Sequence, residues 1–124
     1  MITWKAFIVA LIMQESGGND RAIGDNGASH GPLQIQEACL IDANQWRKAN
    51  GLSQFKFPDD CYDRNKSEAI LIAYLHRYAT EERLGRVPTI EDYARIWNGG
   101  PNGYKKQATV KYWSKLEKRL GLKF

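Results

Sequence analysis

Two carboxylates near the N-terminus, Glu15 and Asp25, have surroundings that differ in a chemically useful way. Glu15 continues the apolar helical face of Phe7 and Leu11, and Gly17 indicates that the helix stops just after it. Burial on such a face raises the pKa of a carboxyl group and keeps it protonated near neutral pH, as a general acid requires. Asp25 precedes Asn-Gly in a polar turn, where a carboxylate stays ionised. One protonated and one ionised carboxyl group are the pair that glycoside hydrolysis uses.

Each carboxylate also has a simpler interpretation. A glutamate in the last turn of a helix is commonly exposed or paired with an arginine, and Glu15 fits that description as well. Asp25 before Asn-Gly is equally typical of an aspartate that only forms the turn. The periodicity does not decide between these interpretations, whereas the presence of both groups within one short segment favours the catalytic pair.

The elements that would position this pair begin with a helix and a hairpin. Thr3 is a good N-cap, and the helix that follows it is expected to end at Gly17. The turn at 25–27 predicts a small β-hairpin or an irregular loop. Pro32 suits the first turn of a second helix, which we expect to run through Gln34 toward Trp46.

The rest of the chain predicts three further helices. After an irregular connection over 50–64, apolar residues from Ile70 to Tyr78 share one face of a third helix. A fourth begins at Thr89, with Asp92 in the capping-box position, and stops at Asn98-Gly99-Gly100-Pro101. The last runs from about Thr109 to Leu120. We therefore predict a mostly helical α+β domain, with about five helices and one small β-hairpin.

Composition sets broader limits. The chain has 124 residues, of which 43% are hydrophobic, which suits one domain over 1–124 with enough core to fold alone. The net charge of +4 favours anionic partners such as nucleic acid, lipid head groups or bacterial cell wall, but no nucleic-acid motif accompanies it. The longest apolar run, Ala6 to Met13, is far shorter than the roughly 20 residues of a membrane span. We expect a monomer without membrane insertion, and we see no signal peptide.

Cysteines and histidines give little sign of further chemistry. Cys39 and Cys61 are compatible with one disulfide or with two free thiols. His30 and His76 are lone histidines without paired ligands, so we predict neither a metal nor another cofactor. Trp4 and Trp113 fall in apolar stripes and are expected to pack in the core.

Three blocks of the sequence resemble the lysozyme superfamily: ALIMQESGGN, GDNGASHGPLQI and YARIWNGGPNGYKKQATVKYW. The third block is most similar to invertebrate-type lysozymes, while the first two are also similar to the lytic transglycosylase and goose-type branch. The resemblance implies a lysozyme-like fold and cleavage of the β-1,4 bond between N-acetylmuramic acid and N-acetylglucosamine in peptidoglycan. By position, it makes Glu15 the general acid and Asp25 the second carboxylate.

The same resemblance implies a substrate cleft. Its polar lining around the scissile sugar would comprise Ser16, Gln34, Tyr93 and Asn98. Gly99 and Gly100 would let the backbone approach the saccharide closely. Trp97, next to Asn98, is the best candidate for stacking on a sugar ring.

Some features depart from the invertebrate type. That type is rich in disulfides, whereas this chain has two cysteines, and Tyr104 and Trp97 stand where a cysteine and often a histidine are expected. A cysteine-poor version suits a phage endolysin or a secreted or periplasmic bacterial enzyme acting on the cell wall. Three alternatives stay open: a lytic transglycosylase that forms 1,6-anhydromuropeptides with Glu15 as acid and base, an inactive lysozyme-like module that binds glycan or protein, and a basic nucleic-acid-binding protein, which charge alone supports.

Overall fold

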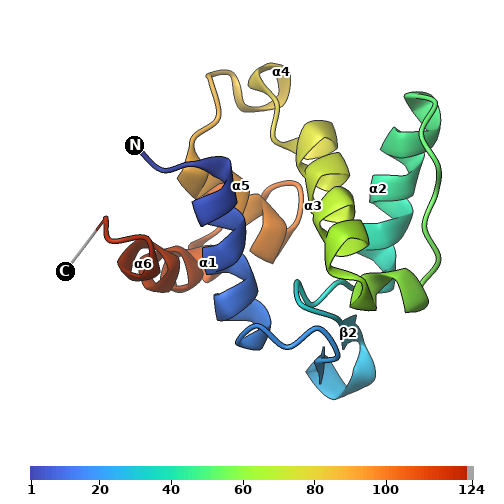
Figure 1. The fold of residues 1–124 in the computed structure, drawn as a ribbon. Helices are drawn as coiled ribbons and strands as arrows, with labels where there is room; N and C mark the ends of the chain where they lie inside the picture. The colour runs from blue at the N-terminus through green and yellow to red at the C-terminus, as the bar shows by residue number, and fades with distance from the viewer. Residues whose placement is uncertain (123–124) are drawn as a thin grey trace.

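Helix α1 (Trp4–Ser16) begins and ends where its capping residues predict. The Thr3 side chain accepts a hydrogen bond from the backbone N–H of Ala6 at 3.1 Å. Gly17 ends the helix with a φ of 66°, a left-handed conformation that glycine adopts without strain. The computed structural model describes residues 1–122 and shows α6 (Val110–Arg119) lying against α1 (Figure 1). Because α1 ends at Ser16, Glu15 lies in its last turn.

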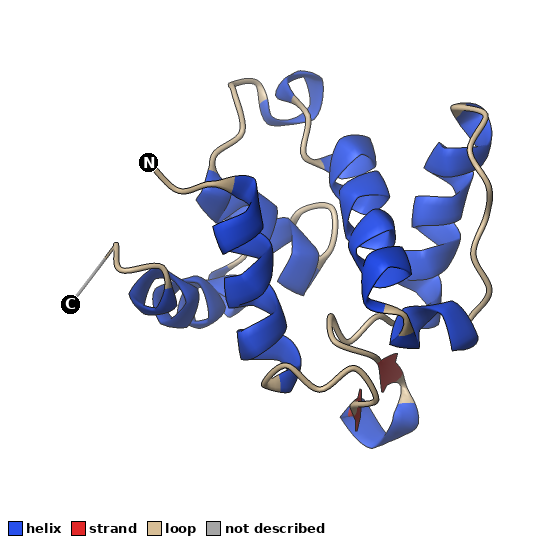
Figure 2. Ribbon diagram, viewed as in Figure 1, coloured by secondary structure: helices blue, strands red, loops and turns tan. Residues whose placement is uncertain are grey.

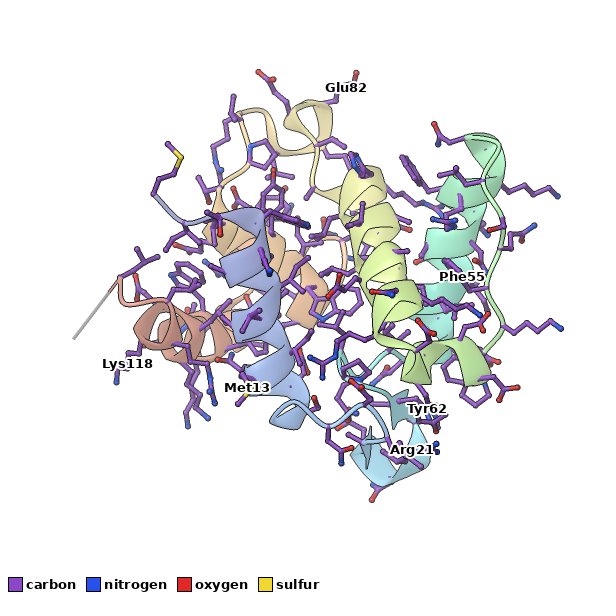
Figure 3. All side chains as sticks on the ribbon, in the orientation of Figure 1. Met13, Arg21, Phe55, Tyr62, Glu82 and Lys118 are labelled. Carbon is purple, nitrogen blue, oxygen red and sulfur yellow. The ribbon has the colours of Figure 1, made fainter. Side chains whose placement is uncertain are left out.

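The predicted hairpin is present and very short. Strands β1 (Ile23–Gly24) and β2 (Ser29–His30) pair antiparallel, joined by a 3₁₀ turn over Asp25–Gly27 (Figure 2). The hairpin is docked on the rest of the protein through His30, whose Nδ1 lies 2.6 Å from the hydroxyl of Tyr62 (labelled in Figure 3). The contact between His30 and Tyr62 therefore fixes the position of the hairpin whose turn carries Asp25.

The second helix begins later than predicted. Helix α2 (Glu37–Ala49) starts at Glu37, and the prediction of a start at Pro32 is wrong. His30 and Ile35 exchange two backbone hydrogen bonds of 3.0 and 2.9 Å, so the chain from 30 to 35 closes into a β-bridge. Gln34 has a φ of 53°, which an α-helix does not allow. The intervening loop borders the cleft described below.

Helix α3 (Arg64–Tyr78) packs along α2 (Figure 1). A 3₁₀ turn over Asp59–Tyr62 precedes it, and the side chain of Asp63 caps its N-terminus. A short helix, α4 (Glu81–Leu84), follows and is absent from the predicted set, because a single turn is too short to show periodicity.

Helix α5 (Ile90–Gly99) begins with the predicted capping box between Thr89 and Asp92. It packs against α3 and α6 and ends at the predicted glycines. Two 3₁₀ turns, over Gly103–Lys105 and Gln107–Thr109, then lead into α6. The six α-helices and the two-stranded sheet of residues 1–122 confirm the predicted α+β class, with one short helix more than the predicted five.

The core lies where α1, α3, α5 and α6 meet. Its fully buried side chains include Phe7, Leu11, Ile70, Ile96 and Leu116. Both cysteines are free thiols. Among the helices of residues 1–122, none has the length and apolar character needed to cross a membrane.

Candidate active site

A cleft of about 400 Å³ lies between the end of α1, the hairpin, α2, α3 and the end of α5. Segments distant in the sequence therefore share one lining. The lining residues are Glu15, Asp25, Ser29, Gln34, Ile35, Gln36, Ala38, Cys39, Asp42, Tyr74, Trp97, Asn98, Gly99, Gly100 and Pro101. Both predicted carboxylates are among them.

Glu15 reaches the cleft from the last turn of α1 and is half-buried. Burial raises the pKa of its carboxyl group from 4.5 to about 7, and the negative charge of Asp25 adds to this rise. The Tyr112 hydroxyl opposes the rise by donating a hydrogen bond of 2.6 Å to Oε2 of Glu15. A carboxyl group with a pKa of about 7 is protonated in a large fraction of molecules at neutral pH, which suits a general acid.

Asp25 faces the cleft from the hairpin turn and is exposed. Its φ is 50°, and that of Asn26 is 56°, a left-handed pair that Asp and Asn tolerate better than most residues. The Ser29 hydroxyl donates a hydrogen bond of 2.5 Å to Oδ2 of Asp25, and the Gln36 amide lies 3.5 Å from the same oxygen. The hairpin thus supplies both the carboxylate and its donors.

The cleft is acidic although the protein is basic overall. Three carboxyl groups line it, those of Glu15, Asp25 and Asp42, and no lysine or arginine of residues 1–122 does. The charge nearest to Asp42 belongs to Arg77, whose Nη1 lies 3.7 Å from Oδ1 of Asp42. Nη1 of Arg77 also donates a hydrogen bond of 2.9 Å to the Asp42 carbonyl oxygen. Neutral sugar hydroxyls and amides can form hydrogen bonds with this lining.

The end of α5 forms the opposite wall. Trp97 lines the cleft and contacts Tyr74 edge to face, with ring centroids 5.7 Å apart. Asn98 is exposed beside it. A side chain at Gly99 would come within 2.4 Å of the Thr109 methyl group, so this position requires glycine. Gly100 has a φ of 89° and open space around it, which leaves its backbone accessible.

Gln34 lines the cleft, but its amide nitrogen is hydrogen-bonded to the backbone on either side of the hairpin. Its Nε2 donates to the carbonyl oxygens of Ala22 at 3.2 Å and Gly31 at 3.0 Å. A side chain on Gly24 would come within 2.3 Å of the Gln34 Oε1, so the glycine makes room for this amide. Gln34 therefore braces the base of the turn that carries Asp25.

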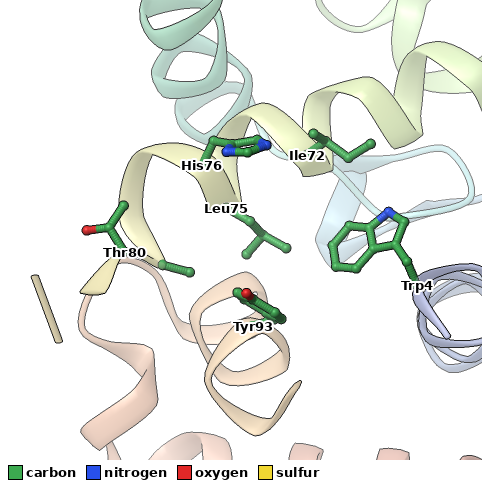
Figure 4. A pocket seen from close by; sticks show the side chains of 7 residues that line it. Trp4, Ile72, Leu75, His76, Thr80 and Tyr93 are labelled. Atoms are coloured by element: carbon green, nitrogen blue, oxygen red, sulfur yellow. The ribbon is translucent and has the colours of Figure 1, made fainter. Parts of the chain in front are cut away.

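Two residues predicted for the cleft lie outside its lining. The Ser16 hydroxyl donates to the Ile12 carbonyl oxygen at 3.1 Å, within its own helix. Tyr93 lies beside a second cavity of about 290 Å³ between α1, α3 and α5 (Figure 4). There its ring meets Trp4 edge to face at 5.9 Å. Trp4 is 41% exposed, so the prediction that it packs in the core is wrong; its ring covers the Phe7 side chain from outside.

Several residues that line the cleft or contact Glu15 were not predicted. Ser29 could have been found, because a serine four residues after Asp25 lies across a tight hairpin from it. Asp42 lies on α2 and Tyr74 on α3, and a helical period does not show which part of a helix borders a cleft. Tyr112 has no local signal, since it is 97 residues from Glu15. Within residues 1–122, no group of three or more His, Cys, Asp or Glu side chains is arranged to hold a metal ion.

Comparison with known proteins places the chain in a family. The Destabilase family model matches residues 5–119. An invertebrate-type lysozyme of Ruditapes philippinarum is 33% identical over 131 residues, covering 99% of this chain and 85% of that protein. A lysozyme of Meretrix lusoria is 44% identical over 98 residues, covering 75% and 69%.

Solved structures give the same picture. The crystal structure of Tapes japonica lysozyme has a TM-score of 0.75 and 31% identity, covering 92% of this chain and 88% of that one. The Meretrix lusoria lysozyme in complex with Aeromonas hydrophila PliI has the same TM-score and coverage at 29% identity.

Proposed function

This chain belongs to the Destabilase family of invertebrate-type lysozymes, and we propose that Glu15 and Asp25 carry out its glycosidic cleavage. The protein is a muralytic glycosidase that acts on peptidoglycan of the bacterial cell wall, and the resemblance noted in its motifs is confirmed. The bond cleaved by such an enzyme is the β-1,4 link between N-acetylmuramic acid and N-acetylglucosamine.

Glu15 is the general acid in this proposal. The observation that carries it is the half-buried Glu15 carboxyl group in the cleft, with its pKa raised to about 7. A proton held at that pKa is available at neutral pH and is transferred to the leaving glycosidic oxygen as the bond breaks. Once the proton has left, the same carboxylate accepts a proton from the incoming water.

Asp25 is the second carboxylate. It reaches the cleft from the hairpin, while Glu15 reaches it from α1. A negative charge at this position stabilises the positive charge that develops on the anomeric carbon, or attacks that carbon directly. The hydrogen bond from Ser29 orients the oxygen Oδ2, and Oδ1, to which no residue of 1–122 donates, is the oxygen proposed for this task.

The rest of the lining binds the glycan. Trp97 offers an aromatic face near the scissile sugar, and Asn98 offers amide groups for sugar hydroxyls or the N-acetyl group. The backbone at Gly100 is open to close approach by the saccharide. Ser16 and Tyr93 act behind the cleft wall, Ser16 in the last turn of α1 and Tyr93 against Trp4 and Phe7.

The exposed charge of the enzyme supports the cell wall as its place of action. Exposed basic residues on α6, among them Lys111, Lys115 and Lys118, favour approach to an anionic cell wall. We propose that the protein acts as a monomer, either as a phage endolysin or as a secreted or periplasmic enzyme.

The decisive experiment compares wild type, Glu15→Gln and the control Glu82→Gln, which changes an exposed glutamate on α4 (Figure 3). Clearing of a peptidoglycan suspension should fall about a thousandfold in Glu15→Gln, because general acid catalysis supplies 10²–10⁴-fold. Glu82→Gln should clear like wild type. Mass spectrometry of the fragments should show reducing-end muropeptides.

Other results would correct the proposal in defined ways. Anhydromuropeptides would identify a lytic transglycosylase. Folded wild type that binds peptidoglycan without clearing it would identify a binding module. Equal clearing by wild type and Glu15→Gln would remove Glu15 from the mechanism.

A further inference from the structure

Tyr112 is the residue that touches Glu15 from outside the cleft. It comes from the first turns of α6, and its hydroxyl lies 2.6 Å from Oε2 of Glu15. Tyr112 does not line the cleft, so it has no direct access to the glycan. Any contribution it makes to cleavage must therefore pass through Glu15.

The contact is fixed by the neighbouring residue on α1. Nε2 of Gln14 donates a hydrogen bond of 2.8 Å to the backbone carbonyl oxygen of Tyr112. Oε1 of Gln14 in turn accepts a hydrogen bond of 3.2 Å from Nε of Arg119, which lies about two turns further along α6. Gln14 thus sets the register between α1 and α6 at the point where Tyr112 meets Glu15.

The direction of the bond follows from the available partners. Within residues 1–122, Glu15 is the sole hydrogen-bond partner of the Tyr112 hydroxyl. If Glu15 donated its own proton to Tyr112, the phenolic hydrogen would be left without an acceptor in a half-buried place, which is costly. Tyr112 therefore donates and Oε2 of Glu15 accepts.

We propose that Tyr112 is a positioning residue whose O–H, donated to Oε2, leaves Oε1 of Glu15 as the oxygen that carries the acid proton toward the substrate. This inference rests on the proposed function of Glu15. The bond keeps one carboxyl oxygen occupied, so the proton is confined to the other. It also persists when Glu15 becomes a carboxylate and stabilises that state.

The test uses Tyr112→Phe, which removes only the hydroxyl group. Tyr112 lowers the pKa of Glu15, so its loss should raise that pKa, by about one pH unit for a hydrogen bond to a charged group. The basic limb of the profile of kcat/KM against pH should move up by the same amount. At its optimum, kcat should fall about tenfold, a part of the total effect of a general acid.

Two further measurements make the test specific. Tyr104→Phe is the matched control, because Tyr104 is also half-buried but, among residues 1–122, it is Tyr112 and not Tyr104 that hydrogen-bonds to Glu15. This control should keep the wild-type profile. The Glu15 carboxyl group is also titrated by ¹³C NMR in each protein, which requires no activity. Unchanged Glu15 titration and an unchanged basic limb in an active Tyr112→Phe enzyme would overturn the positioning role. Failure of the proposed function looks different: a shifted titration in Tyr112→Phe with no clearing by wild type.

Discussion

The two carboxylates of the cleft are held in opposite ways. Asp25 is exposed, and its hydrogen-bond donors, Ser29 and Gln36, lie four and eleven residues further along the chain. Glu15 is half-buried, and its donor, Tyr112, is 97 residues away. The environment of Asp25 is thus built by one short segment, whereas that of Glu15 exists only after α6 has packed on α1.

This difference matches the tasks proposed for the two groups. A carboxylate that stabilises positive charge needs orientation, which a hairpin with fixed donors provides. A general acid needs a raised pKa, which requires removal from water and hence packing by other elements. The hairpin segment therefore orients the Asp25 carboxylate, whereas burial by elements distant in the sequence raises the pKa of Glu15 to the range of a general acid.

Among changes that separate the roles of the two carboxyl groups, removing the negative charge of Asp25 should have the largest effect. Asp25→Asn should reduce clearing of peptidoglycan by about a hundredfold, because the developing positive charge loses its partner. It should also lower the pKa of Glu15, since the charge of Asp25 raises it. The basic limb of the pH profile should then move to lower pH, as a pH series of clearing rates would record.

Asp59→Asn is the control for this change, because Asp59 is exposed and does not line the cleft. It should leave both rate and profile unchanged. Full activity of Asp25→Asn, with anhydromuropeptides as products, would show that one carboxylate suffices and that Asp25 has no catalytic task.

The raised pKa of Glu15 on α1 should also make the free energy of unfolding depend on pH. The pKa of Glu15 is raised in the folded protein, so between pH 4.5 and about 7 the native state holds a proton that the unfolded state has released. Stability is therefore lost as pH rises through this window. Glu15→Gln lacks this loss, so its advantage in free energy of unfolding over wild type should grow by about 2 to 3 kcal/mol across it. Urea denaturation at several pH values measures the difference, and parallel curves would contradict the raised pKa.

The smallest effect is expected from a donor on the hairpin. Ser29 is 1% exposed, donates to Asp25 and accepts from Nε2 of Gln36 at 3.2 Å. Ser29→Ala should leave Asp25 less oriented and slow clearing about fivefold, the equivalent of one hydrogen bond. Ser67→Ala is the matched control, since Ser67 is buried and its hydroxyl has no partner among the described residues. That control should keep full activity; equal losses in both variants would mean that Ser29 only packs.

Local signals in the sequence were enough for much of the fold. The caps at Thr3 and Gly17 and the capping box at Thr89 use side chains and backbone within a few residues, so they are readable from the chain itself. The start of α2 was misplaced because the bridge between His30 and Ile35 depends on the hairpin rather than on Pro32.

For the site, spacing along the chain is enough to predict that a carboxyl group lies at the end of the first helix and a second one in the next turn. It also placed Trp97 and Asn98 before the glycines that end α5, and these residues line the cleft. These features depend on spacing along one segment. The contacts of Tyr112 with Glu15 and of Tyr93 with Trp4 become visible only in the folded protein. Such contacts depend on which helix faces pack together, and a helical period defines a face without naming its partner.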